Sequence, residues 1–143
     1  MRFTRLLMGA LLAMGMAVSV VPLTASPAQA ASQHVGTYGN ESRCQSRGYR
    51  VCYYYSTWTA AYWGGNQDDG DLGNNYFFSG SGSGAGQVVR NNARKIQCDS
   101  WANRCFSYYS PGWQGNYDWL WGGEYGELYY TWNDNASVYI ESR

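Results

Sequence analysis

The sequence predicts an all-β protein in which two Greek-key motifs pack as a two-sheet sandwich, held by two local disulfides. Residues 31–143 contain 16 of the 18 glycines and every Trp and Tyr of the chain. Glycines and aromatic residues suit strands joined by tight turns, and no stretch shows the apolar stripe of a helix. The four cysteines form an even set, and the chain repeats one pattern of landmarks twice.

The first thirty residues have the order of a secretory signal peptide. Two arginines precede a mostly apolar stretch at 6–21, and a small-residue site ends at Ala30. We predict cleavage after Ala30 and a secreted, extracellular chain of residues 31–143. An uncleaved membrane anchor is the alternative, but two prolines interrupt the end of the stretch.

The charge of the secreted part excludes two classes of partner. Without the two arginines of residues 1–30, the 10 basic residues become 8, against 10 acidic ones. A nearly neutral chain has no electrostatic footprint for nucleic acid or for an anionic membrane surface. We therefore expect neither nucleic acid nor a membrane as partner of the mature form.

The cysteines indicate disulfides rather than a metal site. Their spacing favours the pairs Cys44–Cys52 and Cys98–Cys105, although two other pairings are possible. Each favoured pair closes a loop of roughly eight residues, which stabilises a fold by about 2.5 kcal/mol in the chain-entropy model. Zinc is the alternative, but the spacings are wide and no histidine lies near them.

The repeated pattern divides the chain into two halves. In each half a cysteine pair is followed by an aromatic run, a Trp-Gly-Gly and a closing segment, at 88–93 and at 131–136. We predict a flexible N-terminal arm at 31–43, a first repeat at 44–97 and a second at 98–143.

Alternation and turn residues predict the individual elements. The expected loops are 64–73 and 80–86, which are rich in Gly, Asn, Asp and Ser. The expected strands are 51–57, 76–79, 87–90, 105–109, 117–121, 127–132 and 137–140.

One hairpin carries a recognisable motif, Tyr108-x4-Trp113-x-Gly115. It resembles the aromatic hairpin signature of βγ-crystallin domains, in which two rings lie over a folded hairpin and the glycine takes a conformation that a side chain would strain. Its counterpart in the first half, from Tyr55 to Tyr62-x-Gly64, is two residues longer.

The combined pattern over 44–140 is similar to the secreted streptomycete metalloproteinase-inhibitor family, which has a βγ-crystallin-like fold. The resemblance implies an inhibitory segment inside the second disulfide loop, and Ser100–Trp101 is one candidate for the inhibitory bond because Asp99 suits a thermolysin-like protease poorly. The segment consists of Cys98, Asp99, Ser100, Trp101, Ala102, Asn103, Arg104 and Cys105.

Enzyme chemistry is not expected. The only histidine, His34, lies near the start of the mature chain in what we expect to be a loose terminus. Nucleophilic catalysis by a Ser-His or Cys-His pair is therefore not expected. Asp68, Asp69 and Asp71 could supply paired carboxylates, but their surroundings indicate a flexible solvated loop.

Two kinds of ligand, calcium and a glycan, are alternatives to a protease as the partner. Asn133, Asp134 and Ser137 match a βγ-crystallin calcium motif until Val138 replaces its last serine, so we expect no cofactor, with calcium as the one alternative. A glycan could stack on exposed tryptophans, but a small sandwich needs large residues for its core. Of the candidates Trp58, Trp101, Trp113, Trp119, Trp121 and Trp132, we expect exposure only for Trp101.

These observations predict a secreted proteinase inhibitor, directed at an extracellular metalloproteinase, that presents a rigid disulfide-closed loop. The alternative is a non-inhibitory βγ-crystallin-type module that binds calcium, cell wall or a protein partner.

Overall fold

The computed structural model describes residues 28–39 and 42–143. The predicted signal peptide lies outside these residues, except for its last three positions. Within the described ranges, no helix combines the length and the apolar character needed to cross a membrane.

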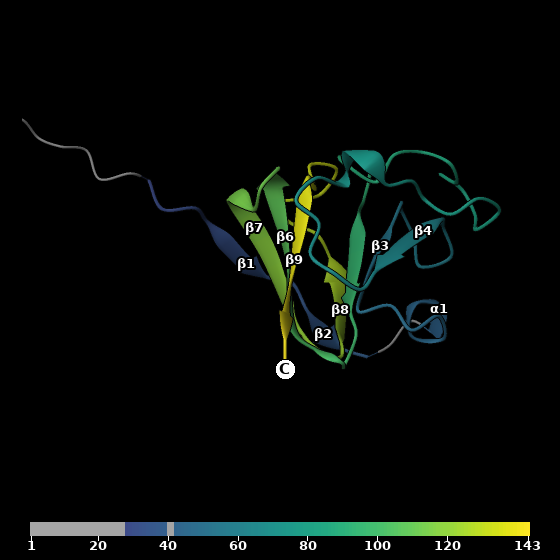
Figure 1. Ribbon diagram of the computed structural model, residues 1–143, viewed down its shortest axis with the longest axis horizontal. Helices are drawn as coiled ribbons and strands as arrows, with labels where there is room; N and C mark the ends of the chain where they lie inside the picture. Colours follow the sequence, from purple (N-terminus) through teal and green to yellow (C-terminus); the bar gives the residue numbers. More distant parts are fainter. Residues whose placement is uncertain (1–27, 40–41) are drawn as a thin grey trace, which may run out of the picture.

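The described residues form two β-sheets, as predicted (Figure 1). The only helical segments among them are the short α1 (Ser42–Gln45) and the 3-10 turn η1 (Leu72–Asn74). In spatial order, the first sheet consists of β1 (Ser32–His34), β7 (Gln114–Trp121), β6 (Ala102–Ser110) and β9 (Ser137–Ser142). The second consists of β2 (Thr37–Tyr38), β8 (Glu124–Glu127), β5 (Lys95–Cys98), β3 (Val51–Tyr54) and β4 (Tyr62–Gly65).

Both predicted disulfides are present, Cys44–Cys52 and Cys98–Cys105. All four cysteines are buried. The all-β fold with two local disulfides is thus confirmed, whereas the Greek-key description of the connections stays a prediction.

Both sheets involve residues of both predicted halves. In the second sheet, β4, β3 and β5 come from the first half, and β8 of the second half continues them. In the first sheet, β9 is bordered by a bridge between Val138 and Asp69, a residue of the first half. One core between the sheets therefore draws on both halves, including Val51, Leu72 and Leu120.

Two asparagines mark equivalent positions in the halves. Asn91 and Asn133 both have positive φ, at 60° and 54°. The Asn91 N–H donates to the carbonyl of Asn135 at 2.9 Å, and the Asn133 N–H donates to the carbonyl of Ala93 at 2.8 Å. This reciprocal pairing makes Asn91 equivalent to Asn133. The sequence match of 88–93 with 131–136 places Asn91 opposite Asp134 instead, so the two alignments differ by one residue.

The strand predictions hold for three long strands and for one short strand. The expected strands at 51–57, 105–109, 117–121 and 137–140 correspond to β3, β6, β7 and β9. Segments 76–79 and 87–90 form only one bridge, Tyr76 to Val88, and 127–132 overlaps β8 by a single residue. The short strands β4 and β5 were not predicted.

The two glycines of β4 explain why the sequence pattern predicts a loop that begins at residue 64. A Cβ on Gly64 would lie 2.3 Å from the Tyr49 ring, and one on Gly65 would lie 2.7 Å from the Trp63 ring. Both glycines therefore serve close packing inside a sheet, not a turn. Gly64 also lacks the positive φ of Gly115, its counterpart in the aromatic hairpin motif of the second half.

The N-terminal arm contains two short strands, β1 and β2. β1 pairs in parallel with β7, and β2 pairs antiparallel with β8, so the arm adds a strand to each sheet (Figure 1). The free edges of β7 and β8 supply the hydrogen-bond partners of these short strands from far along the chain.

The aromatic hairpin joins β6 to β7. Gly115 has φ +80°, which confirms the predicted backbone conformation. The two motif rings do not stack on each other: Tyr108 contacts Tyr117, with ring centroids 5.2 Å apart, and Trp113 contacts Tyr139 at 6.4 Å. Trp113 instead donates its ring N–H to the carbonyl of Val138 at 2.9 Å, which ties the hairpin to β9.

Candidate functional site

The second disulfide loop is a tight turn between the two sheets. Cys98 ends β5 and Ala102 begins β6, so only three residues lie outside the strands. The Ala102 N–H donates to the carbonyl of Asp99 at 3.0 Å, and the Trp101 N–H donates to the Asp99 carboxylate at 3.1 Å. Asp99 is buried, and Trp101 has 69% of its surface exposed. The prediction that Trp101 is exposed is confirmed.

Several contacts hold this turn in place. Besides the disulfide, the Asp99 N–H donates to the carbonyl of Arg50 at 2.7 Å. The Gly123 N–H donates to the carbonyl of Cys98 at 2.9 Å, and the Gly122 N–H donates to that of Asn103 at 2.8 Å. The backbone on both sides of Ser100–Trp101 is therefore fixed before any partner arrives.

The rest of the expected inhibitory segment is not loop. Residues 102–105 all lie in β6, where Ala102 and Cys105 are buried. Asn103 donates to the Glu141 carboxylate at 2.8 Å, and Arg104 makes two hydrogen bonds to it, at 2.6 and 3.0 Å. The hydrogen bond from Arg104 lowers the pKa of Glu141 below its ordinary value of 4.5. Of the eight residues, Ser100 and Trp101 form the exposed tip.

The calcium candidates are separated by their bonding. Asn133 and Asp134 are exposed in the turn before β9. Ser137 is buried, where its hydroxyl donates to the carbonyl of Ser110 at 2.7 Å and accepts the Trp113 N–H at 3.0 Å. In the described part of the chain, no three His, Cys, Asp or Glu side chains are grouped as a metal site.

The acidic segment at 68–71 lies in a loop, as expected, and its carboxylates accept backbone hydrogen bonds. Asp68 accepts the N–H of Ile140 at 2.7 Å, and Asp69 accepts the N–H of Asp71 at 2.9 Å. Asp71 caps η1 by accepting the N–H of Gly73 at 2.8 Å. These carboxylates thus accept hydrogen bonds from backbone N–H groups of the adjacent turns and of a strand some seventy residues away.

His34 is also placed, in contrast to the expected loose terminus. Its ring nitrogen Nε2 lies 2.7 Å from the Glu124 carboxylate, and its ring centroid lies 4.4 Å from that of Trp119. Glu124 is buried and also accepts the N–H of Trp121 at 2.8 Å. The pair fastens β1 to the second half of the chain.

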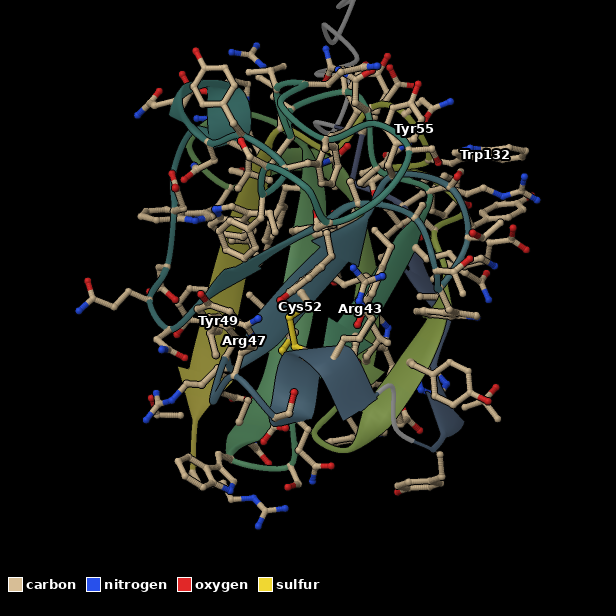
Figure 2. All side chains as sticks on the ribbon, turned by 90° about the vertical axis from the view of Figure 1, so that its right-hand side faces the viewer. Arg43, Arg47, Tyr49, Cys52, Tyr55 and Trp132 are labelled. Atoms are coloured by element: carbon tan, nitrogen blue, oxygen red, sulfur yellow. A yellow bond between two sulfur atoms is a disulfide. The ribbon has the colours of Figure 1, made fainter. Side chains whose placement is uncertain are left out.

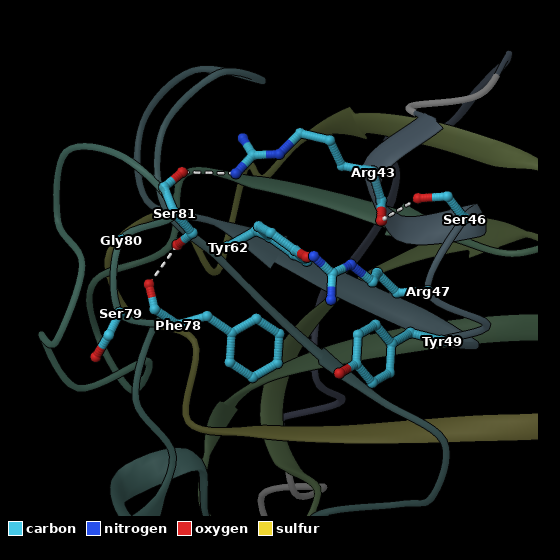
Figure 3. A pocket seen from close by; sticks show the side chains of 9 residues that line it. All are labelled: Arg43, Ser46, Arg47, Tyr49, Tyr62, Phe78, Ser79, Gly80 and Ser81. Atoms are coloured by element: carbon cyan, nitrogen blue, oxygen red, sulfur yellow. Dashed lines mark hydrogen bonds between the residues drawn. The ribbon is translucent and has the colours of Figure 1, made fainter.

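A hollow of about 530 Å³ lies beside α1 (Figure 3). Arg43 donates to three backbone carbonyls and lies over the Tyr62 ring, 4.5 Å from its centroid. Figure 3 shows Arg47 reaching between Tyr62 and Tyr49. None of the described residues that line this hollow carries a carboxylate, so its two guanidinium groups can attract an anionic group. No sequence pattern predicts this hollow, because its lining residues come from 43–49, Tyr62 and 78–81.

Several tryptophans expected in the core or under the hairpin are exposed. Trp113, Trp121 and Trp132 are all at least 39% exposed, and Figure 2 shows Trp132 extending away from the body of the protein. The guanidinium of Arg94 lies 4.9 Å from the centroid of the Trp132 ring. Among all seven, only Trp63 is buried.

Comparison with known proteins assigns no family to this fold and site. No protein-family model matches the chain, and a search of the curated proteins finds no similar sequence.

Proposed function

We propose that this chain is a secreted proteinase inhibitor of metalloproteinases that docks through Ser100–Trp101. The observation that carries the proposal is an exposed tryptophan at the tip of a disulfide-closed turn whose backbone is fixed on both sides. Trp is among the residues that dominate binding energy when buried in a partner's pocket.

Rigidity favours tight binding at this tip. Association costs free energy for every loop and side chain that must be ordered, and a segment held in one conformation loses little more. Asp99, the residue that fits a thermolysin-like protease poorly, is buried and engaged with the turn. An enzyme that approaches the tip meets Ser100 and the apolar Trp101.

The test is titration of a thermolysin-like protease with residues 31–143. We expect inhibition at near-stoichiometric ratios. Trp101→Ala should weaken it at least about 30-fold, the equivalent of about 2 kcal/mol for the loss of one anchoring residue. Trp132→Ala is the matched control, since it removes an exposed tryptophan from another turn. A lack of inhibition across metallo- and serine proteases would end this proposal.

The alternative of a non-inhibitory βγ-crystallin-type module gives a different result. Such a protein leaves every protease in the panel unaffected. If it binds calcium through Asn133 and Asp134, its melting temperature rises with added calcium and falls with chelator. The engaged hydroxyl of Ser137 does not favour this version.

A further inference from the structure

We propose that the outer side of the first sheet binds an uncharged polysaccharide. Cys105, Leu120 and Ile140 point from β6, β7 and β9 into the core between the sheets. Because side chains alternate along a strand, their neighbours face outward. Six of these outward residues are aromatic and together form what we call the aromatic face: Phe106, Tyr108, Tyr117, Trp119, Trp121 and Tyr139.

The rings of the aromatic face lie in register. Trp119 pairs with Phe106, which pairs with Tyr139, so one row of rings crosses three strands. Tyr117 and Tyr108 form a second row beside it. Rows on one side of a strand are about 7 Å apart, and Figure 1 shows β7, β6 and β9 side by side.

Ring contacts join the rows into one surface. The Phe106 ring lies 6.4 Å from Tyr108, 6.0 Å from Tyr117 and 5.9 Å from Tyr139, centroid to centroid. Trp119 lies 5.4 Å from Trp121. Each ring thus holds its neighbours in orientation, so the surface is formed before a ligand arrives.

This composition is unusual for the outer side of an antiparallel sheet, which is typically polar where it meets water. Trp121 and Tyr139 are each 39% exposed, the other four rings are partly buried, and His34 lies against Trp119. Cross-strand packing can explain a pair of aromatic rings, but contiguous exposed apolar surface of this kind marks an interaction site.

Charge and shape indicate the occupant. Arg104, the cation of this surface, is paired with Glu141 and lies 5.2 Å from the Phe106 ring centroid and 5.3 Å from that of Trp121. The surface therefore offers no uncompensated charge to a phosphate backbone or an anionic lipid. The aromatic face spans three neighbouring strands of one sheet, so a flat, extended ligand fits it better than a compact one.

The chemistry of the rings fits a polysaccharide. A sugar chain presents apolar C–H faces with hydroxyl groups at their edges. Tyr108, Tyr117 and Tyr139 likewise combine an apolar ring with a hydroxyl that exchanges hydrogen bonds. No Leu, Ile, Val or Met faces outward from β6, β7 or β9.

The experiment measures depletion of residues 31–143 from solution by amorphous cellulose and by colloidal chitin. We expect saturable binding to at least one of them that persists in 1 M NaCl, about a threefold shorter screening length than at 0.1 M. Trp121→Ala and Tyr139→Ala should each weaken binding at least tenfold. Both side chains are partly exposed, and an unchanged melting temperature shows that each variant folds.

Two control variants make the result specific. Trp132→Ala removes an exposed ring outside the aromatic face, and Trp101→Ala removes the proposed inhibitory anchor; both should bind polysaccharide like the unmodified chain. No binding to either polysaccharide, or equal binding by all variants, would overturn the proposal. So would a dimer in solution that Trp121→Ala dissociates, because the aromatic face would then be covered by a second copy.

Discussion

Asp118→Asn tests how the turn before β9 is held. Asp118 is fully buried on β7, where a charged side chain is costly unless its hydrogen bonds are satisfied. Its carboxylate accepts the N–H groups of Tyr129, Tyr130 and Thr131 at 3.0, 3.1 and 2.9 Å. It also accepts the Thr131 hydroxyl at 2.7 Å. Asparagine keeps the shape but replaces one acceptor oxygen by a donor.

The bonding gives the size of the effect. Oδ1 accepts one of these bonds and Oδ2 accepts three, so the amide group is best placed at Oδ1, facing the N–H of Tyr130. One buried N–H then loses its partner, which costs about 1–3 kcal/mol, and the remaining bonds lose the assistance of the charge. We expect a loss of about 3 kcal/mol in the free energy of unfolding, or about 12 °C in melting temperature for a domain of this size.

The assay is urea unfolding followed by tryptophan fluorescence, together with calorimetry. Asp134→Asn is the matched control, because it makes the same change at an exposed site in the next turn and should shift stability by less than about 0.5 kcal/mol. If Asp118→Asn matched this control, the buried carboxylate would not be what holds residues 129–131.

Three further predictions concern other contacts. Asn135→Ala leaves a buried N–H and a carbonyl of the first half without their partners, so chemical unfolding should show a loss of about 2–4 kcal/mol. Gly64→Ala pushes a methyl group into the Tyr49 ring, and calorimetry should show a loss of about 1–3 kcal/mol; an unchanged melting temperature would refute the packing role of this glycine. Because Arg104 lowers the folded-state pKa of Glu141, the contribution of this carboxylate is complete above its ordinary value of 4.5 and is lost as pH falls through the lowered value. A melting-temperature series in acid should therefore fall less steeply for Glu141→Gln than for the unmodified chain.

Strand length was one reason why only part of the fold could be predicted, although the four-residue β3 was also predicted. β6, β7 and β9 have six to nine residues, which is enough for alternation to be visible. β5 and β8 have four residues each and include the buried polar residues Gln97 and Glu124. Their partners, Tyr54 and His34, are 43 and 90 residues away in the chain, so a local pattern cannot identify these residues as interior.

The candidate site, too, could be predicted only in part. Exposure of Trp101 was predictable because a short disulfide loop has no room to bury a large side chain, and the structure agrees. The aromatic face was not predictable, since the alternation that defines β7 does not say which side of the strand meets the core. Only the pairing of β6 with β7 and β9 shows that the buried side carries Leu120 and the outer side Trp119.

The Trp-Gly-Gly of the second half connects the two proposed surfaces. A Cβ on Gly122 would lie 2.1 Å from the carbonyl of Ala102, so only glycine permits this approach to the turn that bears Trp101. The residue before it, Trp121, belongs to the aromatic face. The fold thus braces the turn through Gly122, and the rigidity of the turn is not by itself a sign of inhibition. The exposure of Trp101 is instead the feature that favours binding of a partner, because nothing in the brace requires a large apolar side chain at that tip.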